Sequence, residues 1–254
     1  MSPSNAPSES TDASEPSQKF RDGTTFVVVT QPAGFLLKVE LVAKVDLSPR
    51  QIFDILVDPH NERVFRTIKV GIRGETLRRT VKRVGHKRLV EVEQVSDWRF
   101  LLFRGHISTR LLVEEDPKAC TLDFKLARRG VMKDFQGSWR LEPYSPAAYE
   151  GAMQRISGTG ERSRPAPPWA GLQASLAGAW PLRRPRSTVI TLSQSVAPAH
   201  APPPLDRLLR GISIRTVRTI VEDLQAEAAR INKEEAARGV HCAAGGLFAQ
   251  LRSC

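Results

Sequence analysis

The feature that most constrains the fold of this chain is a long alternation of apolar and polar residues, followed further on by one amphipathic helix. From Thr67 to Pro143 apolar residues recur at every second position, and turn signals at Gly85, Asp116-Pro117 and Gly130 interrupt them. A period of two is typical of strands with one buried face, and short connections favour antiparallel hairpins. With similar stretches before and after, the sequence predicts seven strands, over residues 35–47, 68–84, 88–98, 100–115, 120–127, 131–142 and 187–197.

Two short helices are expected between the first and the second strand. Ser48 and Gln51 can form a capping box around Pro49, a residue that suits the first position of a helix. Asp58-Pro59 ends this helix, and residues 60–65 favour one further short helical turn.

The strongest helix signal in the chain lies behind Pro202-Pro203-Pro204. Apolar residues recur there at three- and four-residue spacing for about 28 residues, a length of about 40 Å. Seven strands are too many for a flat sheet with one wet face, so we expect them to curl around this helix. The predicted class is α+β: a seven-stranded curved antiparallel sheet around a long C-terminal helix, with two short helices after the first strand.

Three segments are expected to lie outside the packed part of the domain. Residues 1–24 are rich in Ser, Pro, Ala and acids, which predicts a disordered tail. Of the 44 residues at 144–187, 24 are Ala, Pro, Gly or Ser, and so long a stretch is expected to be a low-complexity surface insertion. The sequence thus predicts one domain over 25–238 that contains this insertion, and a loose tail over 239–254.

The charge of the chain invites a nucleic-acid or membrane interpretation. Lys and Arg number 38 against 27 Asp and Glu, which gives a net charge of +11 and a pI near 10.1. Along the expected strands, however, basic residues alternate with Glu, as on a solvated outer face. No specific binding of nucleic acid is therefore predicted, whereas the basic insertion at 144–187 is a candidate for peripheral contact with an anionic membrane.

Compartment signals are weak. The scattered thiols Cys120, Cys242 and Cys254 indicate a reducing, intracellular environment rather than a disulfide framework. The first 24 residues resemble neither a secretory signal nor an Arg-rich transit peptide, and the cytosol, a plastid and a mitochondrion all stay open. No run of residues approaches the roughly 18 apolar residues of a membrane-spanning helix.

The sequence contains no recognisable constellation of catalytic residues. The five histidines are scattered without metal-ligand spacing, and phosphate-binding loops and nucleophile elbows are absent from the sequence. Glu91 and Glu93 share one strand face, but the alternation with Val90 and Val92 points them to solvent. We therefore predict no catalytic residue, no cofactor and no metal site.

Several short motifs follow one another in an informative order. They are Asp58-Pro59-His60-Asn61-Glu62-Arg63-Val64-Phe65, Val90-Glu91-Val92-Glu93-Gln94, Trp98-Arg99-Phe100-Leu101, the run from Phe135 to Pro143, Pro202-Pro203-Pro204, and Leu209-Arg210-Gly211-Ile212. In this order they resemble a plant and algal family of unknown function within the START-like superfamily (SRPBCC, polyketide cyclase/dehydrase and lipid-transport proteins). More distantly they resemble the coenzyme-Q-binding START proteins. The resemblance covers about residues 35–143 and 187–232 and implies the helix-grip fold, in which sheet and helix enclose a cavity for an apolar ligand.

The alternation assigns an inner face to the strands and to the helix. Gly105 and Gly137 lie on this face, where a missing side chain lets a sheet bend. The predicted ligand-binding residues are Val92, Gln94, Trp98, Phe103, Ile107, Phe124, Phe135, Trp139, Ile190, Leu192, Gln194, Ile212, Thr216 and Ile220. Packing of the same residues as a solid core is the alternative.

The expected function is non-catalytic binding or transport of a hydrophobic small molecule, a lipid, quinone or isoprenoid, by a monomer. One alternative is a polyketide cyclase-like enzyme, for which the polar inward candidates are Gln94, Lys133, Gln194 and Thr216. Another alternative is a module that contacts membrane surfaces through the basic insertion.

Overall fold

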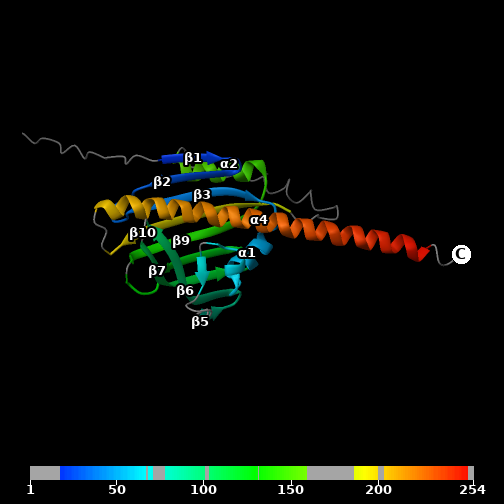
Figure 1. Cartoon of the computed structure of the whole chain (residues 1–254), viewed down its shortest axis with the longest axis horizontal. Coiled ribbons are helices and arrows are strands. Elements are labelled where there is room, and N and C mark those ends of the chain that lie inside the picture. The colour runs from blue at the N-terminus through cyan, green and yellow to red at the C-terminus, as the bar shows by residue number, and fades with distance from the viewer. Residues whose placement is uncertain are drawn as a thin grey trace, which may run out of the picture.

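One antiparallel sheet with a long helix across one of its faces dominates the structure (Figure 1). The computed structural model describes residues 18–66, 68–70, 78–100, 103–130, 132–158, 186–199 and 203–250. The strands are β1 (Gln18–Asp22), β2 (Thr25–Thr30), β3 (Leu37–Val45), β4 (Ile68–Val70), β5 (Arg78–Val84), β6 (Lys87–Phe100), β7 (Phe103–Asp116), β8 (Thr121–Leu126), β9 (Met132–Pro143) and β10 (Thr188–Pro198). Their order across the sheet is β1-β2-β3-β10-β9-β8-β7-β6-β4, and β5 also pairs with β6.

All seven predicted strands are present, but the described part of the sheet has ten strands rather than seven. The expected strand at 68–84 is in fact two strands on the same edge of β6, because Val70 pairs with Gln94 whereas Arg78 pairs with Val92. Residues 71–77 lie outside the described part. The sequence also missed the β1–β2 hairpin, whose first strand begins inside the N-terminal segment that was expected to be a tail.

The two short helices lie where the sequence placed them. The first, α1 (Pro49–Val57), has the predicted capping box, in which Ser48 Oγ accepts a hydrogen bond from Gln51 N and Gln51 Oε1 accepts one from Ser48 N. The second is a single 3-10 turn, η1 (Asn61–Arg63). Buried Ile52 and Phe53 attach α1 to the core below the sheet.

The C-terminal helix α4 (Pro203–Gln250) has 48 residues and is longer than the sequence predicted. Residues 233–238 are exposed, and the helix projects past the sheet in Figure 1. Good helix formers from Lys233 to Ala237 explain why the helix continues without apolar contacts. The segment at 239–254, expected to be a loose tail, is thus helical as far as Gln250.

The main core lies between the inner face of the sheet and α4. The register aligns Leu41, Leu192, Trp139 and Leu122 in one row across β3, β10, β9 and β8, and all four are buried. From α4 the row is covered by apolar residues at helical spacing, namely Val217, Ile220, Val221, Leu224 and Ala228. The predicted inward parity of the strands is therefore confirmed.

The outer face of the sheet carries a second, smaller core that the sequence did not predict. Helix α2 (Pro146–Ser157), at the start of the expected insertion, packs Ala152 and Ile156 against Val28, Val42 and Val189. The sequence did contain the signals of this helix, namely a serine followed by a proline at its start and a glycine at its end. In the structure Ser145 caps the helix, and Gly158 ends it in the left-handed conformation. Residues 159–185 of the insertion lie outside the described part.

Gly137 is required by close packing on the inner face of β9. A methyl group there would lie 2.2 Å from the backbone oxygen of Ser193 and 2.5 Å from Cζ of Phe124. We predict that Gly137→Ala lowers the free energy of unfolding by about 3 kcal/mol, measured by urea denaturation. Gly130→Ala is the matched control, because Gly130 has open space around its Cα. Equal stability of the two variants would contradict this account.

Candidate functional site

The sheet register places several of the predicted ligand-binding residues on the inner face. On the strands, the register places Val92, Phe124, Phe135 and Gln194 on the same side as the core row of Leu192. Four other predicted residues lie in β6 or β7, and their side chains are outside the described part: Gln94, Trp98, Phe103 and Ile107. Burial divides the remaining ten residues into two groups.

The first group belongs to the packed core. Trp139, Ile190, Leu192 and Ile220 are 9%, 0%, 1% and 4% exposed. They contact the buried residues of β3 and α4, so the alternative of a solid core describes this end of the interior. A ligand at this end would have to displace close-packed side chains.

The second group, which we call the open half, keeps part of its surface exposed. Its members are Val92, Phe124, Phe135, Gln194, Ile212 and Thr216, all half-buried. The rings of Phe124 and Phe135 lie with their centroids 5.5 Å apart, and the Phe124 ring covers the bare backbone of Gly137. The open half therefore combines two neighbouring aromatic residues on β8 and β9 with two half-buried residues of α4.

Lys133, one of the polar candidates for a cyclase, does not belong to this interior. The β9–β10 register shifts between Ala197 and Pro198, which pair with Asp134 and Met132. Lys133 is the extra residue of this irregularity, and its side chain is exposed. Gln194 and Thr216 are thus the two described polar residues among the predicted lining residues.

An acid on α4 that the sequence missed marks the boundary of the open half. Asp223 lies seven residues after Thr216 and shares its side of the helix. It is 5% exposed and accepts hydrogen bonds from the backbone N of Arg66, at 2.8 Å, and from the guanidinium of the same residue. The pair fastens the segment after η1 to α4.

A second missed acid lies on the inner face itself. Glu115 is 1% exposed, pairs with Leu122 and Arg88 in the sheet register, and forms ion pairs with Arg78 and Arg88. Arg88 Nε is also buried and has no hydrogen-bond partner in the described structure. Glu115 lies two residues after Val113 on the same strand, so the alternation places both side chains on the inner face. The sequence therefore did indicate that Glu115 points inward.

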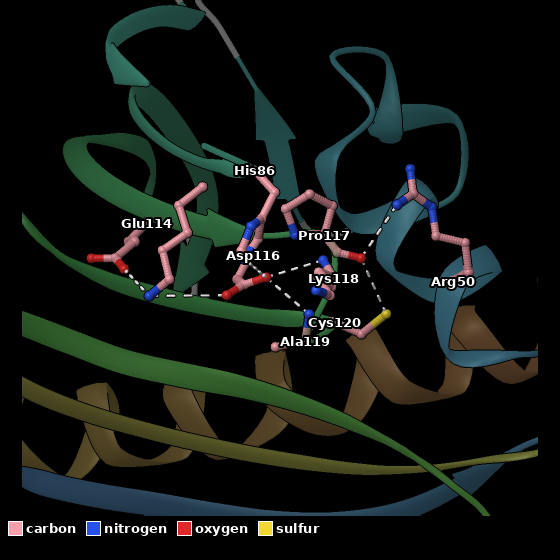
Figure 2. Close-up of polar contacts among 9 residues, drawn as sticks. Arg50, His86, Glu114, Asp116, Pro117, Lys118, Ala119 and Cys120 are labelled. Carbon is pink, nitrogen blue, oxygen red and sulfur yellow. Dashed lines mark hydrogen bonds and ion pairs between the residues drawn. The ribbon is translucent and has the colours of Figure 1, made fainter. Parts of the chain in front are cut away.

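Polar contacts fix the β7–β8 turn next to this acid (Figure 2). Asp116 Oδ1 accepts hydrogen bonds from the backbone N of Ala119 and of Lys118, at 2.9 and 3.0 Å. The Ala119 hydrogen bond is the main reason why the pKa of Asp116 lies below its usual range, and the nearby charges of His86 and Lys87 lower it further. Lys87 also contacts Glu114 at 2.9 Å, which raises the pKa of the lysine.

The same turn contacts α1. The carbonyl oxygen of Pro117 accepts hydrogen bonds from Arg50 at 3.3 Å and from the thiol of Cys120 at 3.7 Å (Figure 2). Burial raises the pKa of the Cys120 thiol, and its side chain packs against the main core. Since a thiolate is the reactive form, this cysteine is suited to packing rather than to nucleophilic chemistry.

Two hollows lie at the edge of the molecule rather than on the inner face. One, of about 230 Å³, is lined by residues of the β1–β2 hairpin and α4, including Asp22, Thr24 and Arg218. The other, of about 290 Å³, lies between the hairpin and α2 and is lined in part by Phe26 and Met153. Within the described residues, no three His, Cys, Asp or Glu side chains come together as a metal site, and no helix is long and apolar enough to span a membrane.

The family described as "Domain of unknown function DUF220" matches residues 26–148. A comparison with curated proteins finds no match.

Similar folds occur among solved structures. Human STARD10 is 10% identical, with a TM-score of 0.52 over 91% of this chain and 80% of that chain. The STAR-related lipid transfer protein of Xanthomonas axonopodis is 9% identical, with a TM-score of 0.48 over 84% and 98%. The Zhui aromatase/cyclase of Streptomyces sp. R1128 is 12% identical, with a TM-score of 0.45 over 76% and 93%. The likeness to STARD10, together with the sheet and α4, identifies the fold as the START-like helix-grip fold, so the predicted α+β class is confirmed.

The buried ion cluster of Glu115 can be tested through stability. Glu115→Gln would leave Arg78 and Arg88 without a counter-charge, and we predict a loss of about 3 kcal/mol in the free energy of unfolding. Glu114→Gln is the matched control, because the Glu114 side chain is 50% exposed and its pair with Lys87 contributes little. Urea denaturation measures both variants, and similar losses would show that Glu115 is not buried in a paired state.

The β7–β8 turn predicts a pH dependence of stability. The folded pKa of Asp116 is lowered from 3.8, so its stabilisation is complete above that value and is lost as the pH falls through the folded pKa. Asp116→Ala should therefore lower the melting temperature at neutral pH, and its difference from the wild type should shrink below pH 3.8. Thermal unfolding over a pH series measures this difference, and a constant gap would refute the assignment.

Proposed function

We propose that this chain binds a hydrophobic small molecule, a lipid, quinone or isoprenoid, between the open half of the inner face and α4. The carrying observation is the contrast in burial along one face. Trp139 on β9 and Leu192 on β10 are buried at the packed end, whereas Phe135, also on β9, and Phe124 on β8 keep exposed surface. An apolar ligand would remove that surface from water, at about 25 cal/mol per Å².

The composition of the open half suits such a ligand. Ligand pockets are mostly apolar and contain a few placed polar groups. Here Phe124, Phe135 and Ile212 supply the apolar surface, and Gln194 and Thr216 supply one amide and one hydroxyl. These two groups can orient a ligand that has a polar end, such as a carboxyl, hydroxyl or carbonyl group.

The surroundings of the open half support a site that is shaped before the ligand arrives. The packed row of Leu41, Leu192 and Trp139 supports one end, and the Asp223–Arg66 pair holds the segment after η1 on α4. Rigid walls lower the ordering cost of binding. The START-like fold adds support, because the resemblance implies a cavity between sheet and helix.

The direct test is native mass spectrometry of the full chain, with extraction and identification of any bound lipid. We expect a hydrophobic molecule to copurify or, after delipidation, a lipid, quinone or isoprenoid to bind and raise the melting temperature. Protein that is empty on isolation and whose melting temperature does not respond to a panel of such ligands would overturn the proposal.

A filling variant locates the site. Thr216→Trp should place an indole in the open half and reduce ligand loading at least about tenfold, since the ligand must displace a large side chain to bind. Ala226→Trp is the matched control, because Ala226 lies on the exposed side of the same helix. Native mass spectrometry measures the loaded fraction of both variants, and equal loading would place the ligand elsewhere.

A further inference from the structure

Four cations around the turn between β8 and β9 have no ion-pair partner among the described residues. Lys125, Arg128, Arg129 and Lys133 flank the β8–β9 turn, and we call them the basic rim. All four side chains are exposed, and none takes part in an ion pair within the described structure. Asp134 is the one acid in the sequence from residue 125 to 135.

Elsewhere the outer face of the sheet neutralises its cations across neighbouring strands. Arg140 pairs with Asp123 at 3.0 Å and Arg79 with Glu91 at 3.1 Å, and Lys87 pairs with Glu114. A similar cross-strand pair joins Arg110 to Glu93, and Lys38 pairs with Glu40 on its own strand. The basic rim is one of the places in the described structure where exposed cations lack such partners.

The basic rim borders the open half directly. Lys125 follows Phe124 on β8, and Lys133 lies two residues before Phe135 on β9. The cations therefore surround the end of the sheet at which the inward aromatic residues are least covered. A negatively charged planar surface attracted to the rim would meet the open half.

We propose that the basic rim docks the domain on an anionic phospholipid bilayer, with the open half turned toward the lipid. The role of the docking, exchange of the hydrophobic ligand with the bilayer, rests on the proposed function. The docking itself depends on charge alone. It places the membrane contact at the β8–β9 turn rather than on the insertion at 144–187.

A bilayer fits the rim better than a nucleic acid does. Binding of single strands combines cations with exposed aromatic residues on which bases stack. The exposed large aromatic residues of the described part are Phe20 and Tyr144, which lie on β1 and before α2, away from the rim. Phe124 and Phe135, beside the rim, are half-buried on the inner face, and their rings contact each other. Four cations around a turn suit lipid phosphates, which need no groove and no stacking platform.

The test is cosedimentation of the full chain with phosphatidylcholine vesicles that contain or lack phosphatidylserine. We expect binding only to the anionic vesicles, and weaker binding as salt is added. The triple variant R128Q/R129Q/K133Q should bind on the order of 100-fold more weakly, since each basic residue at an anionic surface strengthens binding severalfold.

A charge-matched control separates position from net charge. K82Q/R83Q/K118Q also removes three exposed cations without ion pairs in the described structure, on β5 and in the β7–β8 turn. It should bind anionic vesicles within about twofold of the wild type. Equal losses in the two triple variants, unchanged binding of R128Q/R129Q/K133Q, or stronger binding of the wild type to a single-stranded oligonucleotide than to the vesicles would each overturn the docking proposal.

Ligand binding in solution distinguishes this inference from the proposed function. R128Q/R129Q/K133Q should take up a fluorescent fatty acid from solution as the wild type does, because the rim lies outside the open half. If the wild type binds vesicles but no hydrophobic ligand, the proposed function fails and the docking stands. If it binds the ligand but not the vesicles, the docking fails and the proposed function stands.

Discussion

The contact between the apolar stripe of α4 and the inner face of the sheet is the interaction on which the rest of the structure depends. Val217, Ile220 and Leu224 lie against a row that includes Leu41 and Leu192, and all of these side chains are buried. A sheet with one apolar face is unstable in water until another element covers it. Inner-face residues of the open half such as Phe124 and Phe135 are only half-buried, and they form the candidate ligand site.

Buried charge marks the edges of that contact. Glu115 and Asp223 are nearly inaccessible to solvent, and each is held by arginine: Arg78 and Arg88 for the first, Arg66 for the second. Isolated buried carboxylates are costly, so these acids persist because their partners come from other elements of the fold. They fasten β5 and β6 to β7, and the segment after η1 to α4.

The outer face of the sheet shows how the high net positive charge of the chain is distributed. Helix α2 covers part of this face with Ala152 and Ile156, and cross-strand ion pairs neutralise much of the remainder. A pI near 10.1 therefore does not describe a uniformly basic surface. The unpaired cations of the described part include the basic rim, so their position rather than their number suggests a partner.

Period-two and period-3.6 patterns are local, so they predicted the strands other than the β1–β2 hairpin, the cap of α1 at Ser48, and the inward parity of residues such as Phe124. Alternation did not show that Trp139 is core whereas Phe135 is half-buried, since exposure depends on which side chains of other elements pack over each position. Helix α2 had a local cap, but its partners Val28 and Val189 are distant in sequence. The pairing of Asp223 with Arg66, 157 residues apart, was likewise decided only by the tertiary structure, which brings such residues together.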